Sequence, residues 1–175
     1  MDMSLKYIDD SDKCYGVTGM AIGIVALDSE SLLESLSLDA DPGNSVKFMP
    51  EYYFSGNPRL SARIAWNEIL RHFQLSMAMM ISNVMCRYYV GRHTSISDEL
   101  RKVMLETVSN EGHDTCSLDD DEISNLFAKS YNYLHRLFSH NGVQAVASDF
   151  ARTLSARRQL TRSEVIEELR ALSML

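Results

Sequence analysis

Residues 57–90 read NPRLSARIAWNEILRHFQLSMAMMISNVMCRYYV and decide the fold class of this 175-residue chain. Asn57 followed by Pro58 is a typical helix start, because an Asn side chain caps the first turn and proline suits the first helical position. Neither glycine nor proline interrupts the chain from there to Gly91. The stretch therefore predicts one long helix.

The second half of this helix, from Leu75 to Val90, carries apolar side chains on nearly every side. A helix that is apolar all round is buried all round, which predicts a central position in a bundle. Polar residues in and beside this half are too frequent for a membrane span. They are Gln74, Ser76, Ser82, Asn83 and Arg87.

Further helices are predicted from capping residues and from apolar side chains spaced three and four apart. Their boundaries are Ser95 or Ser97 to a stop at Gly112, Ser117 with Asp120 to Asn141, 143–154, and Thr161 with Glu164 to Leu172. The last helix is expected to bury Val165, Ile166, Leu169 and Leu172. The fold class predicted for the chain is mainly α, a single-domain bundle of about five or six helices around the long central helix, with the bundle over residues 57–175.

The N-terminal third is expected to be less regular. Residues 1–15 suit a flexible acidic arm, and residues 16–56 suit a small appendage with a strand or short helix plus a turn. Within the appendage, the length and β-branching of 15–27 favour a strand, but a short buried helix fits as well. The spacing of Gly19 and Gly23 would matter only in a helix, and we attach no weight to it.

Two more segments complete the N-terminal third. Asp28 is expected to cap a short helix that holds the leucines of 32–38. Residues 46–54 are expected to be extended, with Pro50 confining them to a sheet edge or an irregular segment.

Negative charge is concentrated in this same third. The chain has 17 basic and 24 acidic residues, a net charge of −7. Residues 1–56 alone contain three basic and ten acidic residues. Such a skew is typical of a solvated face and argues against an extended contact with nucleic acid or an anionic membrane.

The cysteines and the N-terminus predict a cytoplasmic protein. Cys14, Cys86 and Cys116 are odd in number and widely spaced, unlike the disulfide framework of a secreted protein. The first residues lack the basic stretch and the cleavage site of an export signal. We therefore expect reduced thiols and no membrane partner.

The standard catalytic and cofactor motifs are missing, including the phosphate-binding G-x-x-x-x-G-K-S/T, the dinucleotide-binding G-x-G-x-x-G and the nucleophile motif G-x-S-x-G. We therefore expect no cofactor and assign no catalytic residue. An enzyme with an unfamiliar site is the third hypothesis, with Tyr131 and His135 as its candidate side chains.

Metal ligands are also too few. His113 and Cys116 form the one local His/Cys pair, and a zinc site needs more ligands nearby. Glu68 and His72 lie four residues apart, which a surface pair on a helix explains. We expect no metal.

Four arginines gather at the joint between the last two predicted helices. Two capped helices joined by a short turn resemble a helix-turn-helix in outline, and arginines there could contact phosphates. Acidic residues follow directly, however, so nucleic acid is the less favoured partner. A nucleic-acid-associated regulator is the second hypothesis, and its contact residues are Arg152, Arg157, Arg158 and Arg162.

Methionine and tyrosine on the central helix favour self-association. Both residue types are enriched at packed interfaces, and this helix has apolar surface to cover on both sides. The sequence thus favours a homodimer through Met79, Cys86 and Tyr89. The leading hypothesis is a non-enzymatic protein–protein interaction or scaffolding domain, with the acidic N-terminal third as a contact surface for an unidentified protein partner.

The capping box at the last helix is directly testable. Thr161→Ala removes the hydroxyl that accepts from the first turn, and we expect the free energy of unfolding to fall by about 1 kcal/mol. Urea unfolding measures the change. Ser163→Ala, two residues into the same helix, is the control and should leave stability unchanged; equal midpoints for the two variants would contradict this helix boundary.

Overall fold

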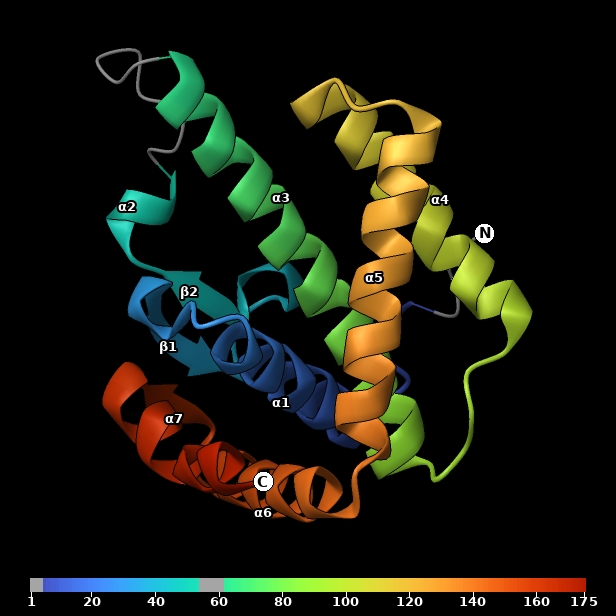
Figure 1. The fold of residues 1–175 in the computed structure, drawn as a ribbon. Coiled ribbons are helices and arrows are strands. Elements are labelled where there is room, and N and C mark those ends of the chain that lie inside the picture. Colours follow the sequence, from blue (N-terminus) through green and yellow to red (C-terminus); the bar gives the residue numbers. More distant parts are fainter. Residues whose placement is uncertain (1–4, 54–61) are drawn as a thin grey trace.

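The computed structural model describes residues 5–53 and 62–175. The prediction of a mainly α helical bundle is confirmed, with seven α-helices and a small three-stranded sheet in the described residues. Figure 1 shows α3, α4 and α5 on one side of α1, and α6 and α7 on the other. The elements are α1 (Asp10–Ala26), β1 (Leu33–Ser37), β2 (Val46–Phe48), α2 (Pro50–Tyr53), α3 (Ala62–Met85), α4 (Asp98–Cys116), α5 (Asp120–Ser139), α6 (Asn141–Arg157), β3 (Gln159–Thr161) and α7 (Arg162–Glu168).

The long central helix is present as α3, which continues into a π-helical turn over Cys86–Gly91. Its predicted start at Asn57 and Pro58 lies outside the described residues. Its apolar second half is covered within the chain, because α1, α4 and α5 all pack against α3.

The N-terminal helix α1 is a second buried helix, which the sequence allowed over residues 15–27 as the alternative to a strand. The flexible arm predicted for residues 1–15 is wrong from residue 10 onward, and the strand favoured for 15–27 is wrong as well. Asp9 caps α1 by accepting from the Asp12 amide at 2.8 Å. Acidic residues in the first turn also suit the positive end of the helix dipole.

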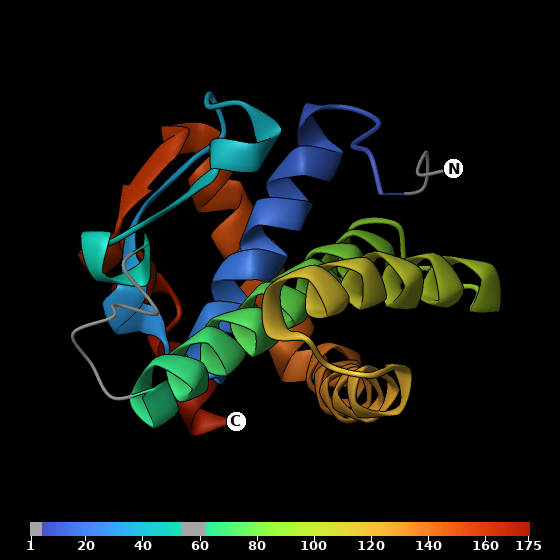
Figure 2. The same ribbon diagram turned by 90° about the horizontal axis from the view of Figure 1, so that it is seen from above.

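Glycines explain how α1 packs so closely against α3 (Figure 2). A Cβ atom at Gly19 would lie 2.2 Å from the carbonyl oxygen of Ser82 and 2.7 Å from the Cβ of Cys86. A Cβ at Gly23 would lie 2.5 Å from the Ser82 hydroxyl. We attached no weight to the spacing of Gly19 and Gly23 in the sequence. In the structure these two glycines form the surface of α1 that contacts α3.

A buried ion pair holds the start of α1 to the end of α3. Arg87 is wholly buried and donates to Asp12 at 2.7 Å, and Arg92 donates to the same carboxylate at 2.9 Å. Burial by itself would raise the pKa of Asp12, but hydrogen bonds from Arg87 and the Ile8 amide and the charge of Arg87 outweigh it, so the pKa is lowered. Arg87 also donates to the carbonyl oxygen of Lys6, which ties the preceding segment to α3.

The short helix predicted for 32–38 is wrong, because this segment is the middle strand of the sheet. The strand order is β2-β1-β3, and both pairings are antiparallel. An irregularity in the register between Leu33 and Ser35 lets Leu33 and Leu36 both point into the core. A bulge of this kind gives a strand the three-residue spacing of a helix.

The prediction that residues 46–54 are extended is correct for β2. The chain then turns into α2 at Pro50, where proline suits the first helical position. Phe54, the last residue of the predicted extended segment, lies outside the described residues.

Two predicted helix ends also need correction. α4 does not stop at Gly112 but runs to Cys116, and a Cβ at Gly112 would lie 2.8 Å from Ile123 and 3.0 Å from Phe73. This glycine serves close packing and not chain termination. The capping box of α5 is made by Asp119 with Glu122 instead of Ser117 with Asp120.

The caps at the other ends agree with the sequence. Ser97 caps α4, and Thr161 forms the predicted capping box of α7 with Glu164. No helix in residues 5–53 or 62–175 combines the length and apolarity needed to cross a bilayer.

The contact between α1 and α3 is testable with one methyl group. Gly19→Ala would push a Cβ into the Ser82 carbonyl, a backbone atom that cannot rotate away, and we expect the free energy of unfolding to fall by about 2 kcal/mol. Urea unfolding followed by circular dichroism measures it. Gly43→Ala is the control, since no atom lies within 4 Å of its added Cβ; equal stability of the two variants would contradict the close contact.

Candidate protein-binding groove

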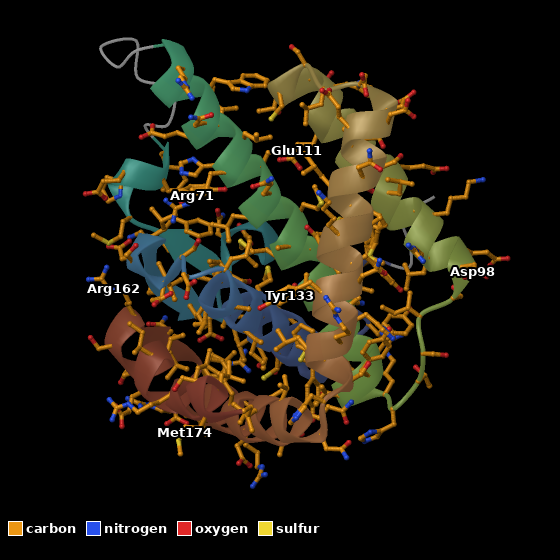
Figure 3. All side chains as sticks on the ribbon, viewed as in Figure 1. Arg71, Asp98, Glu111, Tyr133, Arg162 and Met174 are labelled. Atoms are coloured by element: carbon orange, nitrogen blue, oxygen red, sulfur yellow. The ribbon has the colours of Figure 1, made fainter. Side chains whose placement is uncertain are left out.

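An apolar groove opens between the C-terminal end of α1, the C-terminal half of α5 and the C-terminal segment that holds α7. Its volume is about 380 Å³, within the range typical of ligand-binding clefts. Figure 3 shows Tyr133 of α5 near the centre of this face, with Met174 at its lower edge. The lining residues are Val25, Ala26, Asp28, Glu30, Tyr133, Leu137, Ile166, Leu169, Arg170, Leu172 and Ser173.

Local structure at the end of α1 builds one wall. Asp28 adopts a left-handed conformation with φ of 51°, which ends the helix. Aspartate tolerates this conformation better than most residues. A 3₁₀ turn over Glu30–Leu32 follows and brings Glu30 to the groove. Tyr133 donates to the carbonyl oxygen of Ala26 at 3.4 Å and so connects α5 to the same wall.

The opposite wall comes from α7 and the turn that follows it. Val165 and Leu169 are buried, as predicted for this helix. Ile166 was expected on the same buried face, but 40% of it is exposed and it lines the groove. The mouth of the groove is therefore partly apolar.

Charge within the groove is mainly negative. The Oε2 atom of Glu30 is buried and has no hydrogen-bond partner among the described residues. Asp28 is exposed and forms no salt bridge in the same part of the chain. Arg170, the basic residue of the lining, is paired with Glu167 at 2.5 Å. Two carboxylates against one paired arginine give the groove wall a net negative charge, which favours a ligand with a basic group.

The predicted arginine cluster is divided among partners on several elements. Each guanidinium contacts an acidic side chain or a backbone carbonyl, and the hydrogen bonds that Arg158 donates to Asp10 and Asp39 raise its pKa. This arrangement leaves less positive charge for phosphates than the sequence suggested. The pairs are Arg152–Asp149 at 2.6 Å, Arg157–Glu164, Arg158–Asp10 at 2.7 Å, Arg158–Asp39 at 2.9 Å, and Arg162 with the Ser31 carbonyl oxygen at 3.0 Å.

The three predicted interface residues do not share one surface. Cys86 is wholly buried against Gly19, and Met79 is 9% exposed, so these two side chains offer little surface to a second copy. Their apolar surface is covered by the chain itself. Tyr89 is half-buried and lies within hydrogen-bonding distance of His135, 2.9 Å from its Nδ1.

The enzyme candidates Tyr131 and His135 do lie together with Tyr89. Their rings are stacked, with centroids 6.4 Å apart, and the Arg101 guanidinium lies 4.3 Å from the Tyr131 ring. Burial, and then the nearby Tyr131, raise the pKa of Tyr89 well above its usual range. A phenol with a raised pKa next to an exposed imidazole is a poor proton donor, so this cluster gives little support to catalysis.

The candidate metal pair does not converge. The Nε2 atom of His113 lies 2.7 Å from Asp120, and Cys116 is buried. Within the described ranges, no group of three or more His, Cys, Asp or Glu side chains could hold a metal ion.

Comparison of the chain with protein-family models, with curated proteins and with solved structures finds no match. The geometry of the groove is therefore the basis for a functional proposal. The sequence pointed to this groove only through Asp28 and Glu30, which belong to the acidic N-terminal third. The groove residues from α5 and α7 lie more than 100 positions further along the chain, so the sequence alone does not bring them together.

The paired arginines lead to a prediction about nucleic acid. We expect the unmodified protein to cause no shift of duplex DNA or single-stranded RNA in a gel at low salt, because acidic partners pair with three of the four arginines. A shift that disappears in an Arg157→Ala/Arg158→Ala variant and weakens with salt would contradict this expectation and support the nucleic-acid hypothesis.

Proposed function

We propose that this protein is a non-enzymatic protein-interaction module that binds a segment of a partner protein in the groove between α1, α5 and α7. The observation that carries the proposal is an apolar groove whose lining includes the two carboxylates Asp28 and Glu30. Exposed apolar surface of this kind is typical of binding sites.

The occupant that fits is a segment of another protein with apolar side chains beside a lysine or arginine. The apolar side chains would contact Tyr133, Leu137 and Ile166. The basic group would donate to Glu30 and face Asp28, and a charge-assisted hydrogen bond is stronger than a neutral one. The sequence led us to expect the whole acidic N-terminal third as a contact surface. The proposed binding uses only Asp28 and Glu30 from it.

Two finer points remain predictions. The first is a homodimer, for which the central helix now gives less reason, because α1, α4 and α5 cover it within one chain. The second is a cytoplasmic location, with reduced Cys14, Cys86 and Cys116.

Selection of random peptides displayed on phage against the full chain tests the proposed function. We expect enriched peptides to combine apolar residues with a lysine or arginine. Ile166→Glu should abolish their binding, and Glu30→Gln should weaken it about tenfold through loss of the charged acceptor. Ile8→Glu is the matched control, since Ile8 is 73% exposed and lies outside the groove.

Two outcomes would contradict the proposal. One is enrichment of peptides that bind the Ile166→Glu variant as well as the unmodified chain. The other is a dimer, detected by light scattering over a dilution series, that Ile166→Glu dissociates and Ile8→Glu does not; a second copy would then occupy the groove.

A further inference from the structure

The walls of the groove between α1, α5 and α7 are built from helices and turns. The lining residues belong to these three helices and to the turns that follow α1 and α7, and none of them lies in β1, β2 or β3. The sheet lies away from α5 (Figure 1). A peptide that binds as an added strand needs a sheet edge for its backbone hydrogen bonds. The described lining of this groove has no such edge.

The side-chain donors in the lining already have acceptors within the chain. The Tyr133 hydroxyl donates to the Ala26 carbonyl oxygen at 3.4 Å. The Ser173 hydroxyl donates to the Arg170 carbonyl oxygen at 2.8 Å, and the Arg170 guanidinium pairs with Glu167. An extended peptide would therefore bury backbone carbonyl groups against walls with few free donors, which is costly. A helix satisfies these carbonyl groups with its own amides.

The apolar side chains of the groove are arranged as in helix–helix packing. Tyr133 and Leu137 lie four residues apart on α5 and so form one row along that helix. Rows with this spacing are the ridges that fit between the side chains of another helix. Tyr133 is 43% exposed, and Ile166 on the opposite wall is 40% exposed. The two walls thus leave open apolar surface for one further helix.

Negative charge at one end of the groove has a source besides Asp28 and Glu30. Helix α1 ends here at Ala26, and the C-terminal end of a helix carries a partial negative charge. The last turn of α1 contains no basic residue that would offset this charge. On a bound helix, a lysine or arginine one turn from the apolar side chains lies on the same face, so it would reach this end of the groove.

We infer that the partner segment binds in this groove as an amphipathic α-helix, with its apolar face against α5 and α7 and a lysine or arginine at the end of α1. This inference rests on the proposed function and adds the conformation of the ligand. A helix makes its own backbone hydrogen bonds, so it needs only apolar surface and negative charge from the protein. The lining supplies both.

Two phage libraries, panned against the full chain, test the conformation. One displays a stable helical scaffold with a randomised face, and the other displays linear random peptides. We expect binders from the helical library, and we expect Ile166→Glu to abolish their binding and Ile8→Glu to retain it. For an isotope-labelled linear binder in complex with the full chain, the carbon-13 chemical shifts of the Cα atoms should be those of a helix.

Proline substitution in the linear binder gives a second measure. Proline at a central position that faces away from the groove should weaken binding about a hundredfold, because it removes a helical hydrogen bond and clashes with the preceding turn. Proline at the first helical position is the matched control and should leave the affinity unchanged.

The outcomes separate this inference from the proposed function. Linear binders that Ile166→Glu disrupts, but whose bound shifts are those of an extended chain or which tolerate the central proline, would overturn the inference and leave the proposed function standing. The absence of binders from both libraries would overturn both.

Discussion

The packing of α1 directly on the backbone of α3 is the constraint on which the rest of the structure depends. A side chain larger than hydrogen at Gly19 would meet the Ser82 carbonyl oxygen at 2.2 Å, so the two helices could not approach as they do. With α1 held there, its far side is free to pack against α6, and its first turn places Asp12 next to Arg87. A buried arginine without that carboxylate would be an uncompensated charge, so the glycine contact and the ion pair depend on each other.

The acidic N-terminal third therefore has two uses in the fold. Asp10, Asp12 and Asp39 pair with arginines from α6 and from the end of α3, and these pairs tie the N-terminal third to distant parts of the chain. Asp28 and Glu30 have no such partner in the described residues and lie at the groove. A net charge counted along the sequence cannot separate these two groups, because pairing depends on elements that are far apart in the chain.

The candidate groove combines apolar side chains with the two carboxylates Asp28 and Glu30. This combination of aliphatic surface and negative charge is the basis of the proposal that a peptide with apolar and basic side chains binds there.

The sequence by itself determined the features that depend on neighbours along the chain: the mainly α class, the long apolar helix, and the caps at Ser97 and Thr161. Those signals are local, because a cap or an apolar stripe acts within a few residues. The tertiary structure decided the helical state of 10–26, the strand at 33–37 and the candidate groove. The role of Gly19 and Gly23 is visible only where α1 contacts α3. The leucines of β1 are recognisable as strand residues only when β2 and β3 pair with that segment. Such contacts join residues far apart in sequence, and their energies appear only when the chain is folded.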